Sequence, residues 1–447
     1  MSPDRADYKP TPVYNVVGNV NLDLPYILSS KYDVGLRLRR FSLYSEGGAS
    51  MGASSFDIVT VGGGLAASSF AKSMAERGAK VLILEQEKHF KDRVRGEYIV
   101  TWGVAEAREL GILDLLRQAC ASELPWIEMG FGFRDLRVTT PQQLPGLSFS
   151  HPEMQETLLT AAERSGVVVR RGATVQYIES GPHPQLVVAQ DGHQEKISCR
   201  LVAAADGRNS AARKWLGLAT KKSGDPFLFS GVLLSGVAAR EDAGWFIFNP
   251  ELGLIGALVP QGRGRFRAYF GYPSSSGYRL NGKESLSLFL SESLKVAPIF
   301  GEFYGNVKDI GPLASFDGGD FWVEHPYRDG VVLLGDAAGT TDPSFGQGMA
   351  LSLRDARTLR DELLHDSNWD DAGHRYAQKH DTYYQRCRTA CGWLRAIFQE
   401  QSPEAAARRQ RSLPRIAEDL TRVPDHLFGG PELPLDDAVR ARFFGES

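Results

Sequence analysis

The sequence predicts an α/β fold in which a domain that begins with a βαβ unit is interrupted by an inserted antiparallel β-sheet and followed by C-terminal helices. Three glycine-rich segments stand in a fixed order, each after an apolar run: GGGLAA at 62–67, ADGRNSAAR at 205–213 and GDAAGTTDPSFGQG at 335–348. Between the second and third segments, the pattern changes to β-rich runs separated by short turns. Together these observations indicate one dinucleotide site that is assembled from three distant parts of the chain.

The first glycine-rich segment lies inside the predicted βαβ unit. Two apolar runs are typical of buried strands, DIVTV at 57–61 and VLIL at 81–84. Gly78 ends the helix between them, which is predicted by apolar residues at helical spacing, Ala66, Phe70 and Met74. A strand, a glycine-rich turn and a helix in this order are what a dinucleotide-binding loop requires.

Each small residue of this loop has a predicted role. Gly62 permits the tight turn, Gly64 lets the backbone approach a pyrophosphate, and Ala67 keeps helix and strand close together. The helix N-terminus binds the phosphates through its free amides and its dipole. Glu85, about twenty residues further on, is placed to accept hydrogen bonds from ribose hydroxyls. For this motif alone, a glycine-rich turn in another α/β protein is the alternative.

Composition and charge exclude several classes of function. The chain has 447 residues and a net charge of −3, which gives no sign of a nucleic-acid partner. We expect no membrane span and no secretory signal, and therefore a cytoplasmic protein, either a monomer or a homodimer. Four cysteines without a CxxC pair argue against a disulfide framework and a structural zinc, and we expect no metal. Cys387 and Cys391 belong to an apolar helical stripe, which predicts that both lie in the core.

Residues 1–50 differ in composition from the rest of the chain. They are rich in Asn, Asp, Pro, Tyr and Ser and show no sustained period, and Met51 resembles a natural start. We predict a disordered or loosely attached extension. A transit peptide and a start-site artefact are the alternatives.

From Phe56 to about Leu363 the chain resembles the class A FAD-dependent monooxygenases, the family of p-hydroxybenzoate hydroxylase. The likeness rests on all three motifs in order, and its later two include Asp206, Gly207, Ser210, Arg213, Gly335, Asp336, Ala337, Pro343, Gly346 and Gly348. The resemblance implies a Rossmann-type, glutathione-reductase-like FAD-binding domain that is discontinuous, over 51–225 and 327–400. It also implies a substrate-binding β-sheet domain at 226–326 and a C-terminal helical tail at 401–447.

The resemblance also implies the residues that bind FAD. Arg95 resembles the flavin-side arginine of the family, with Arg93 as its neighbour, whereas His151 stands where the family often has Arg, so Gln155 is a candidate substitute. The full set expected at the cofactor is Gly62, Gly64, Ala66, Ala67, Glu85, Gln86, Arg93, Arg95, Gln155, Asp206, Gly207, Asp336, Pro343, Gly346, Gln347, Gly348 and Met349.

The third motif joins a strand end to a helix start. Asp336 follows the apolar run VVLL, so its carboxylate is placed to accept from a ribityl hydroxyl of the flavin. A helix opening at 346–350 directs its N-terminus at the flavin pyrimidine edge and stabilises reduced flavin by about 1 kcal/mol. For Asp206 in the second motif, an ordinary strand-end turn is the alternative to a role at the pyrophosphate.

The intervening segment supplies the predicted sheet. A helix at 284–296 follows four β-rich runs, at 227–237, 244–249, 252–260 and 265–272. Their many aromatic residues alternate between two faces, and the sequence does not show which face lines the substrate cavity. Arg267 is either solvated or a substrate anchor. His325 is a weak candidate for a catalytic base, with a structural histidine as the alternative.

The function implied is FAD-dependent hydroxylation or epoxidation of an apolar, aromatic or polycyclic small molecule, using NAD(P)H and O2. The resemblance implies that a flavin C4a-hydroperoxide activates the oxygen, so catalytic side chains remain unassigned. A flavin-dependent halogenase is one alternative, although the Trp-x-Trp-x-Ile-Pro motif of that family is missing. A prenyl reductase and a non-catalytic flavin-binding protein are the others.

Overall fold

The computed structural model describes residues 56–223 and 227–446. The extension predicted at 1–50 lies outside these residues. All described helices and strands belong to the unit that begins at Gly52.

The first sheet contains the strands that precede the three glycine-rich motifs. Its strand order is β20-β21-β11-β1-β2-β8, with β9 and β10 added beyond β11. Strands β2, β1, β11 and β21 run parallel, as does β8. The bounds are β1 Phe56–Val61, β2 Val81–Glu85, β8 Val168–Arg171, β9 Thr174–Glu179, β10 Gln185–Gln190, β11 His193–Ala204, β20 Tyr327–Arg328 and β21 Val331–Leu333. The predicted βαβ unit is therefore present, and the strands before all three motifs are neighbours in one sheet.

Helices pack together on one side of this sheet. Helix α1 (Leu65–Ala75) contacts both α5 (His151–Arg164) and α9 (Gly348–His365), and α2 (Thr101–Glu109) also packs on α9. Their apolar residues join those of the strands in one core, with Phe70, Ile83 and Leu353 fully buried. Helix α3 (Leu113–Ala119) completes this layer against α5. Because α9 directly follows the third motif, this packing fixes where its N-terminus lies.

The second large sheet is mainly antiparallel and contains the four predicted β-rich runs. Its order is β17-β13-β16-β15-β14-β5-β6, with β18 also paired to β13. The bounds are β5 Trp126–Glu128, β6 Phe133–Asp135, β13 Phe227–Ser235, β14 Ala243–Asn249, β15 Leu254–Pro260, β16 Arg265–Pro273, β17 Lys308–Asp309 and β18 Ala314–Asp317. Strands β13 to β16 match the four predicted runs within two residues. The sheet also recruits β5 and β6 from before the predicted segment, and β5 pairs with β14 in parallel.

Two short sheets and one further helix complete the elements before the third motif and around it. Two three-stranded sheets consist of β3 Tyr98–Ile99, β4 Ser122–Leu124 and β7 Gly146–Ser148, and of β12 Lys221–Ser223, β19 Asp320–Trp322 and β22 Gly339–Thr340. The predicted helix at 284–296 is α7 (Leu286–Val296), preceded by a 3-10 turn at Lys283–Ser285. Helix α7 covers the face of β14, β15 and β16 that bears Phe266 and Tyr272.

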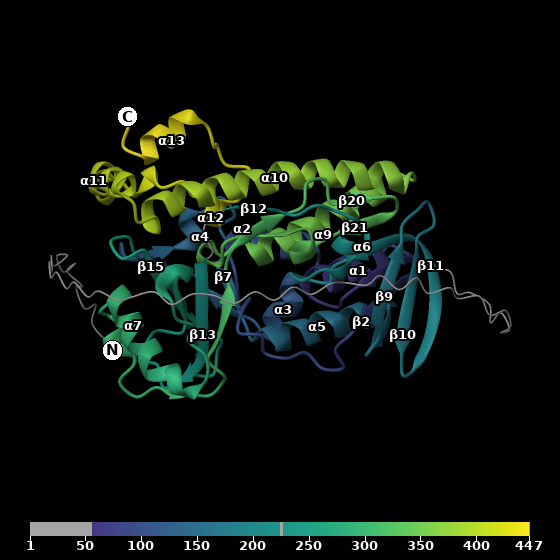
Figure 1. Cartoon of the computed structure of the whole chain (residues 1–447), viewed down its shortest axis with the longest axis horizontal. Helices are drawn as coiled ribbons and strands as arrows, with labels where there is room; N and C mark the ends of the chain where they lie inside the picture. The colour runs from purple at the N-terminus through teal and green to yellow at the C-terminus, as the bar shows by residue number, and fades with distance from the viewer. Residues whose placement is uncertain (1–55, 224–226, 447) are drawn as a thin grey trace, which may run out of the picture. The chain divides into compact units, whose positions relative to one another are not determined.

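The C-terminal part is helical. Helix α10 (Trp369–Phe398) runs along α9 and beside the C-terminal segment, as Figure 1 shows. Cys387 and Cys391 on α10 are buried in an apolar cluster, so their predicted core position is confirmed. The later helices are α11 Pro403–Glu418, α12 His426–Gly429 and α13 Asp437–Phe443. They pack against α10 and α2, which extends the core beyond the predicted domain boundary at residue 400.

Candidate functional site

One cavity of about 600 Å³ lies between the two sheets. All three glycine-rich motifs contribute to its lining, and so do strands β13 to β16. Fifteen of the seventeen predicted cofactor residues line it; Ala67 and Gln347 do not. The parts of the chain that carry the motifs are more than a hundred residues apart, and the parallel sheet brings their strand ends to one edge.

The first motif forms a cradle at the end of β1. Gly62 has φ of +96°, and a Cβ there would lie 2.6 Å from the carbonyl oxygen of Ala205. Gly64 differs, because a Cβ at this position would point into the cavity and find only Gln155 Nε2, at 3.8 Å. The backbone N–H of Gly63 donates to Glu85 Oε2 over 2.7 Å, which holds this carboxylate at the cavity edge. Ala67 is fully buried between helix and strand, which agrees with its packing role.

The second motif ties the site together. The Oδ2 atom of Asp206 accepts from the backbone amides of Ala211 and Ala212, while Oδ1 is buried without a hydrogen-bond partner in the described structure. Arg213 donates to the carbonyl oxygens of Asp336 and Ala337, over 3.1 Å and 2.9 Å. The resemblance places Arg213 in the second motif. Its two hydrogen bonds link the second motif to the third.

Asp336 stands in the 3-10 turn Gly335–Ala337 after β21 and lines the cavity. Its carboxylate receives no hydrogen bond from the described residues, so it is available to a ligand. Withdrawal from bulk water raises its pKa, and the guanidinium groups of Arg95, Arg208 and Arg213 oppose that rise. Beyond it, α9 begins at Gly348, two residues later than the predicted opening at 346. Gly346 instead adopts the left-handed conformation, with φ of +64°.

Gln347 is a positioning residue in this arrangement. Its side chain accepts from Trp102 Nε1 over 3.0 Å and donates to the carbonyl oxygen of Leu427 over 3.1 Å. It is 1% exposed. Its side chain does not line the cavity, because its amide binds the loop before α9 to α2 and to the C-terminal segment. Its predicted role at the cofactor stays a prediction.

A strained loop carries the two predicted arginines. Val94 has φ of +56°, a conformation that a β-branched residue rarely adopts, and its amide donates to Asp92 Oδ1 over 2.9 Å. Arg93 and Arg95 on either side both line the cavity. The same loop presents Glu97, a cavity residue that the sequence analysis did not identify.

His151 also lines the cavity, at the N-terminus of α5, with Gln155 one turn further on. Its Nδ1 lies 2.7 Å from the carbonyl oxygen of Gly96, and desolvation lowers the pKa of the ring to about 4. The ring is therefore neutral at pH 7, so Nδ1 carries a proton and donates to this carbonyl. Unlike an arginine, it brings no charge to the site.

The second sheet supplies an apolar wall. Phe246, Ala257 and Tyr269 are paired across β14, β15 and β16 and line the cavity, as do Ile255 and Phe316. The neighbouring residues on the same strands, Trp245, Phe266 and Tyr272, face the core under α7. The register of the strands thus decides which aromatic residues meet a ligand.

Neither weak candidate for catalysis lines the cavity. Arg267 is 2% exposed, so the prediction of a solvated side chain is wrong; Asp92 and Glu97 cover it. His325 lies outside the cavity beside α10, where its amide donates to Asp381 and its Nε2 lies 2.8 Å from Nδ1 of His374. These contacts agree with a structural histidine.

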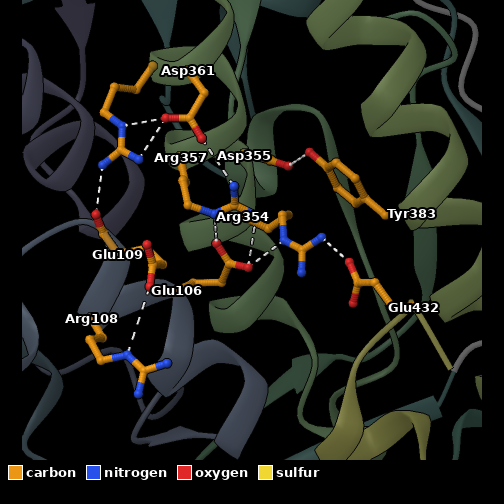
Figure 2. A network of polar contacts seen from close by, with 10 residues as sticks. Glu106, Arg108, Glu109, Arg354, Asp355, Arg357, Asp361, Tyr383 and Glu432 are labelled. Atoms are coloured by element: carbon orange, nitrogen blue, oxygen red, sulfur yellow. Dashed lines mark hydrogen bonds and ion pairs between the residues drawn. The ribbon is translucent and has the colours of Figure 1, made fainter. Parts of the chain in front are cut away.

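The helix behind the third motif is braced by buried charges, shown in Figure 2. Glu106 on α2 is 4% exposed and binds two arginines of α9, with Oε1 2.5 Å from Nε of Arg354 and Oε2 bound by Arg357. On the same helix, Asp355 accepts from the hydroxyl of Tyr383 and from the amide of Gly335, over 2.5 Å and 2.7 Å. This network links α9 to α2, α10 and the third motif.

No group of three or more His, Cys, Asp or Glu residues is arranged to hold a metal ion among residues 56–223 and 227–446. Across those residues, no helix is long and apolar enough to span a membrane.

Comparison with known proteins identifies the family. A model of the FAD-binding domain matches residues 55–394, which is more than half of the chain. The chain belongs to this family. The match confirms the resemblance to the class A flavin monooxygenases. The geometry fits the cofactor, because the cavity has a glycine cradle with room for a pyrophosphate, a helix N-terminus and the carboxylate of Asp336.

Individual relatives are distant. The chain is 26% identical over 323 residues to aklavinone 12-hydroxylase of Streptomyces peucetius. The match covers 65% of this chain and 64% of the hydroxylase, which is less than two thirds of the hydroxylase's length. It is 24% identical over 326 residues to digeranylgeranylglycerophospholipid reductase 2 of Methanococcoides burtonii, covering 69% and 74%. The structure of p-nitrophenol 4-monooxygenase from Pseudomonas putida superposes with a TM-score of 0.69 at 18% identity, covering 83% of this chain and 97% of that one. This last likeness shows the fold.

Proposed function

We propose that this protein is an FAD-dependent monooxygenase that uses NAD(P)H and O2 to hydroxylate or epoxidise an apolar, aromatic or polycyclic small molecule. The observation that carries the proposal is the single cavity in which the three cofactor motifs meet the apolar wall of the second sheet. A ligand on that wall would share the cavity with a cofactor held by the motifs. Family relatives that include a hydroxylase support the same reaction class.

The bound flavin supplies the oxygen activation, so the protein needs only to bind, orient and exclude water. The N-terminus of α9 and the guanidinium groups of Arg95 and Arg208 place positive potential in the cavity. The carboxylate of Asp336 is free to accept from a ribityl hydroxyl. Phe246 and Ile255 exclude water from the opposite side.

The proposal is tested by following NAD(P)H oxidation and oxygen uptake in the purified protein with a panel of apolar aromatic compounds. Oxidation should be slow without a ligand and accelerate on the order of tenfold or more with a suitable one, because binding energy is used to bring about reduction. The hydroxylated or epoxidised product should appear by mass spectrometry.

The control adds chloride or bromide and a separate flavin reductase. Incorporation of halide, with no compound that accelerates NAD(P)H oxidation by the protein alone, would replace the monooxygenase with a halogenase. Ligand-stimulated reduction of a prenyl double bond without oxygen uptake would replace it with a reductase.

A further inference from the structure

A buried carboxylate behind the cavity holds the turn that carries Asp336. On α9, the Oδ2 atom of Asp355 accepts from the backbone amide of Gly335 over 2.7 Å. Its Oδ1 atom accepts from the hydroxyl of Tyr383 on α10 over 2.5 Å, as Figure 2 shows. Asp355 is fully buried and does not line the cavity, so it acts on a ligand only through other residues.

The 3-10 turn Gly335–Ala337 is fixed at both of its ends. At its start, Gly335 has φ of +58°, and a Cβ there would lie 2.9 Å from a side-chain oxygen of α9. Further on, Arg213 donates to the carbonyl oxygens of the other two residues of the turn. Asp336 lies between these fixed points and lines the cavity. The direction of its carboxylate therefore depends on Arg213 from one side and on Asp355 from the other.

A carboxylate is a costly group to bury behind this turn. The two donors that it receives, a peptide amide and a phenol, are both neutral. Burying a charge is unfavourable, and a neutral acceptor would link α9 to α10 at a lower cost. The charge has one advantage, because hydrogen bonds to an ionised acceptor are roughly twice as strong as those to a neutral one. Asp355 therefore fixes the amide of Gly335 more firmly than the packing of the two helices requires.

We propose that Asp355 is a positioning residue for the cofactor: by holding the amide of Gly335, it orients the carboxylate of Asp336 toward the ribityl chain of FAD. The inference rests on the proposed function, because it assumes that Asp336 accepts from the flavin. Binding groups that must be held in one direction need such support from a second layer of residues. Because Asp355 acts through Asp336, its removal should weaken FAD binding by no more than the removal of Asp336 does.

The ionisation of Asp355 supplies a further signature. Burial raises its pKa to about 6, and the nearby His380, the hydroxyl of Tyr383, the amide of Gly335 and the guanidinium of Arg354 oppose the rise. The charged and titratable groups that face it are Arg354 from its own helix and, from α10, Tyr376, His380, Tyr383 and Tyr384. The ionised carboxylate accepts both hydrogen bonds, whereas the protonated form must displace one of the two donors. FAD binding should therefore be tight above pH 7 and weaken as the pH falls through 6.

The affinity of the apoprotein for FAD and for ADP tests this role, measured by calorimetry without NAD(P)H. ADP shares the adenosine and pyrophosphate of FAD and lacks the ribityl chain that Asp336 is expected to bind. Asp355→Ala should weaken FAD binding roughly tenfold and leave ADP binding unchanged, because the loss of one charge-assisted hydrogen bond at the cofactor accounts for about that factor. An equal loss for both probes would overturn the inference, since Asp355 would then support only the fold.

A second variant keeps the test decisive if Asp355→Ala does not fold. Asp355→Asn preserves the buried volume and one acceptor for the amide of Gly335, so it should fold and lose FAD affinity by a smaller factor. Its affinity for ADP should again be unchanged. An equal loss for FAD and ADP in this variant would overturn the inference in the same way.

A double substitution shows whether Asp355 acts through Asp336. If it does, Asp355→Ala, or Asp355→Asn in its place, should cost less than about twofold in FAD affinity once Asp336→Ala is present. Additive losses, or a larger loss for Asp355→Ala than for Asp336→Ala, would overturn the inference. Asp361→Ala is the matched control. It removes a carboxylate of the same helix that is 43% exposed and pairs with Arg357, so it should leave the FAD affinity unchanged.

Tyr383→Phe tests the pH signature. The hydroxyl of Tyr383 lowers the pKa of Asp355, so its loss should make the fall in FAD affinity begin at a higher pH. With Asp355→Asn also present, Tyr383→Phe should leave the pH profile where Asp355→Asn alone puts it. A profile that Tyr383→Phe does not move, or moves equally in both backgrounds, would overturn the inference.

Failure of the proposed function looks different. If the protein is not a monooxygenase, no compound will stimulate NAD(P)H oxidation, while the losses in FAD affinity remain as expected. If Asp336 does not bind the flavin, Asp336→Ala alone will leave the FAD affinity unchanged, and the inference is overturned with it.

Discussion

Gly62 and Gly64 belong to the same loop, yet the structure gives them different reasons to be small. Gly62 needs a positive φ and has a carbonyl oxygen where a Cβ would be. Gly64 has φ of −74°, which any residue adopts, and the space beside it is the cavity. The first glycine serves the fold, and the second leaves room for the cofactor.

This distinction predicts the outcome of two substitutions. Gly64→Val should give a folded but colourless protein, because the side chain fills the space for the pyrophosphate and contacts little else. Gly62→Ala should instead lower the thermal midpoint, whether or not FAD is added. Absorbance of bound flavin and thermal unfolding separate the two effects. A Gly64→Val protein with stoichiometric FAD would contradict the role of this loop.

Asp336 allows a second prediction at this scale. Its carboxylate has no hydrogen-bond donor within the described chain, so Asp336→Ala removes a contact to the cofactor and little from the fold. A hydrogen bond to a charged group contributes roughly 1.5 to 3 kcal/mol, so the affinity for FAD should fall on the order of tenfold or more. Titration of the apoprotein with FAD measures this loss. An unchanged dissociation constant would remove Asp336 from the site.

At the scale of the element, α9 depends on buried charge pairs with α2. Removing one partner from a buried ion pair costs about 3 to 5 kcal/mol, because the remaining charges stay buried without it. Glu106→Gln should therefore destabilise the protein by an amount in that range, measured by denaturant unfolding. Glu109→Gln on the same helix is the control: its side chain is 58% exposed in a 3.9 Å pair with Arg108, and surface pairs contribute about 0 to 1 kcal/mol. Equal effects of the two substitutions would show that the network in Figure 2 does not brace α9.

At the scale of the whole molecule, the cofactor site joins segments that are spread over residues 61–352. FAD should therefore raise the thermal midpoint, since a ligand at 100 times its dissociation constant stabilises the native state by about 2.7 kcal/mol. Riboflavin is the matched control, because it lacks the pyrophosphate and adenosine that Gly64 and Glu85 are expected to receive. It should produce a much smaller shift at the same concentration. Equal shifts would show that the glycine cradle contributes nothing to binding.

Local patterns in the sequence determined the elements and most of the cofactor site. The βαβ unit and strands β13 to β16 were predicted within two residues, because alternation, helical spacing and glycine positions are properties of neighbouring residues. The three motifs, together with the family resemblance, identified fifteen residues that line one cavity. The sequence did not show that the side chain of Gln347 hydrogen-bonds to Trp102 and to the carbonyl oxygen of Leu427 and does not line the cavity.

Only the tertiary structure decided which polar residues face one another across the chain. Arg267 looked solvated or substrate-binding from its strand alone, and it is buried because the loop at 92–97 folds over it. Tyr269 and Glu97 are 172 positions apart, and no periodicity relates them. The parallel pairing of β5 with β14 is equally non-local. Backbone preference acts over a few residues, whereas burial and charge pairing depend on the packing of whole elements. This is why the cofactor loop and the strands of the opposite wall could be predicted, but not which residues of that wall face the cavity.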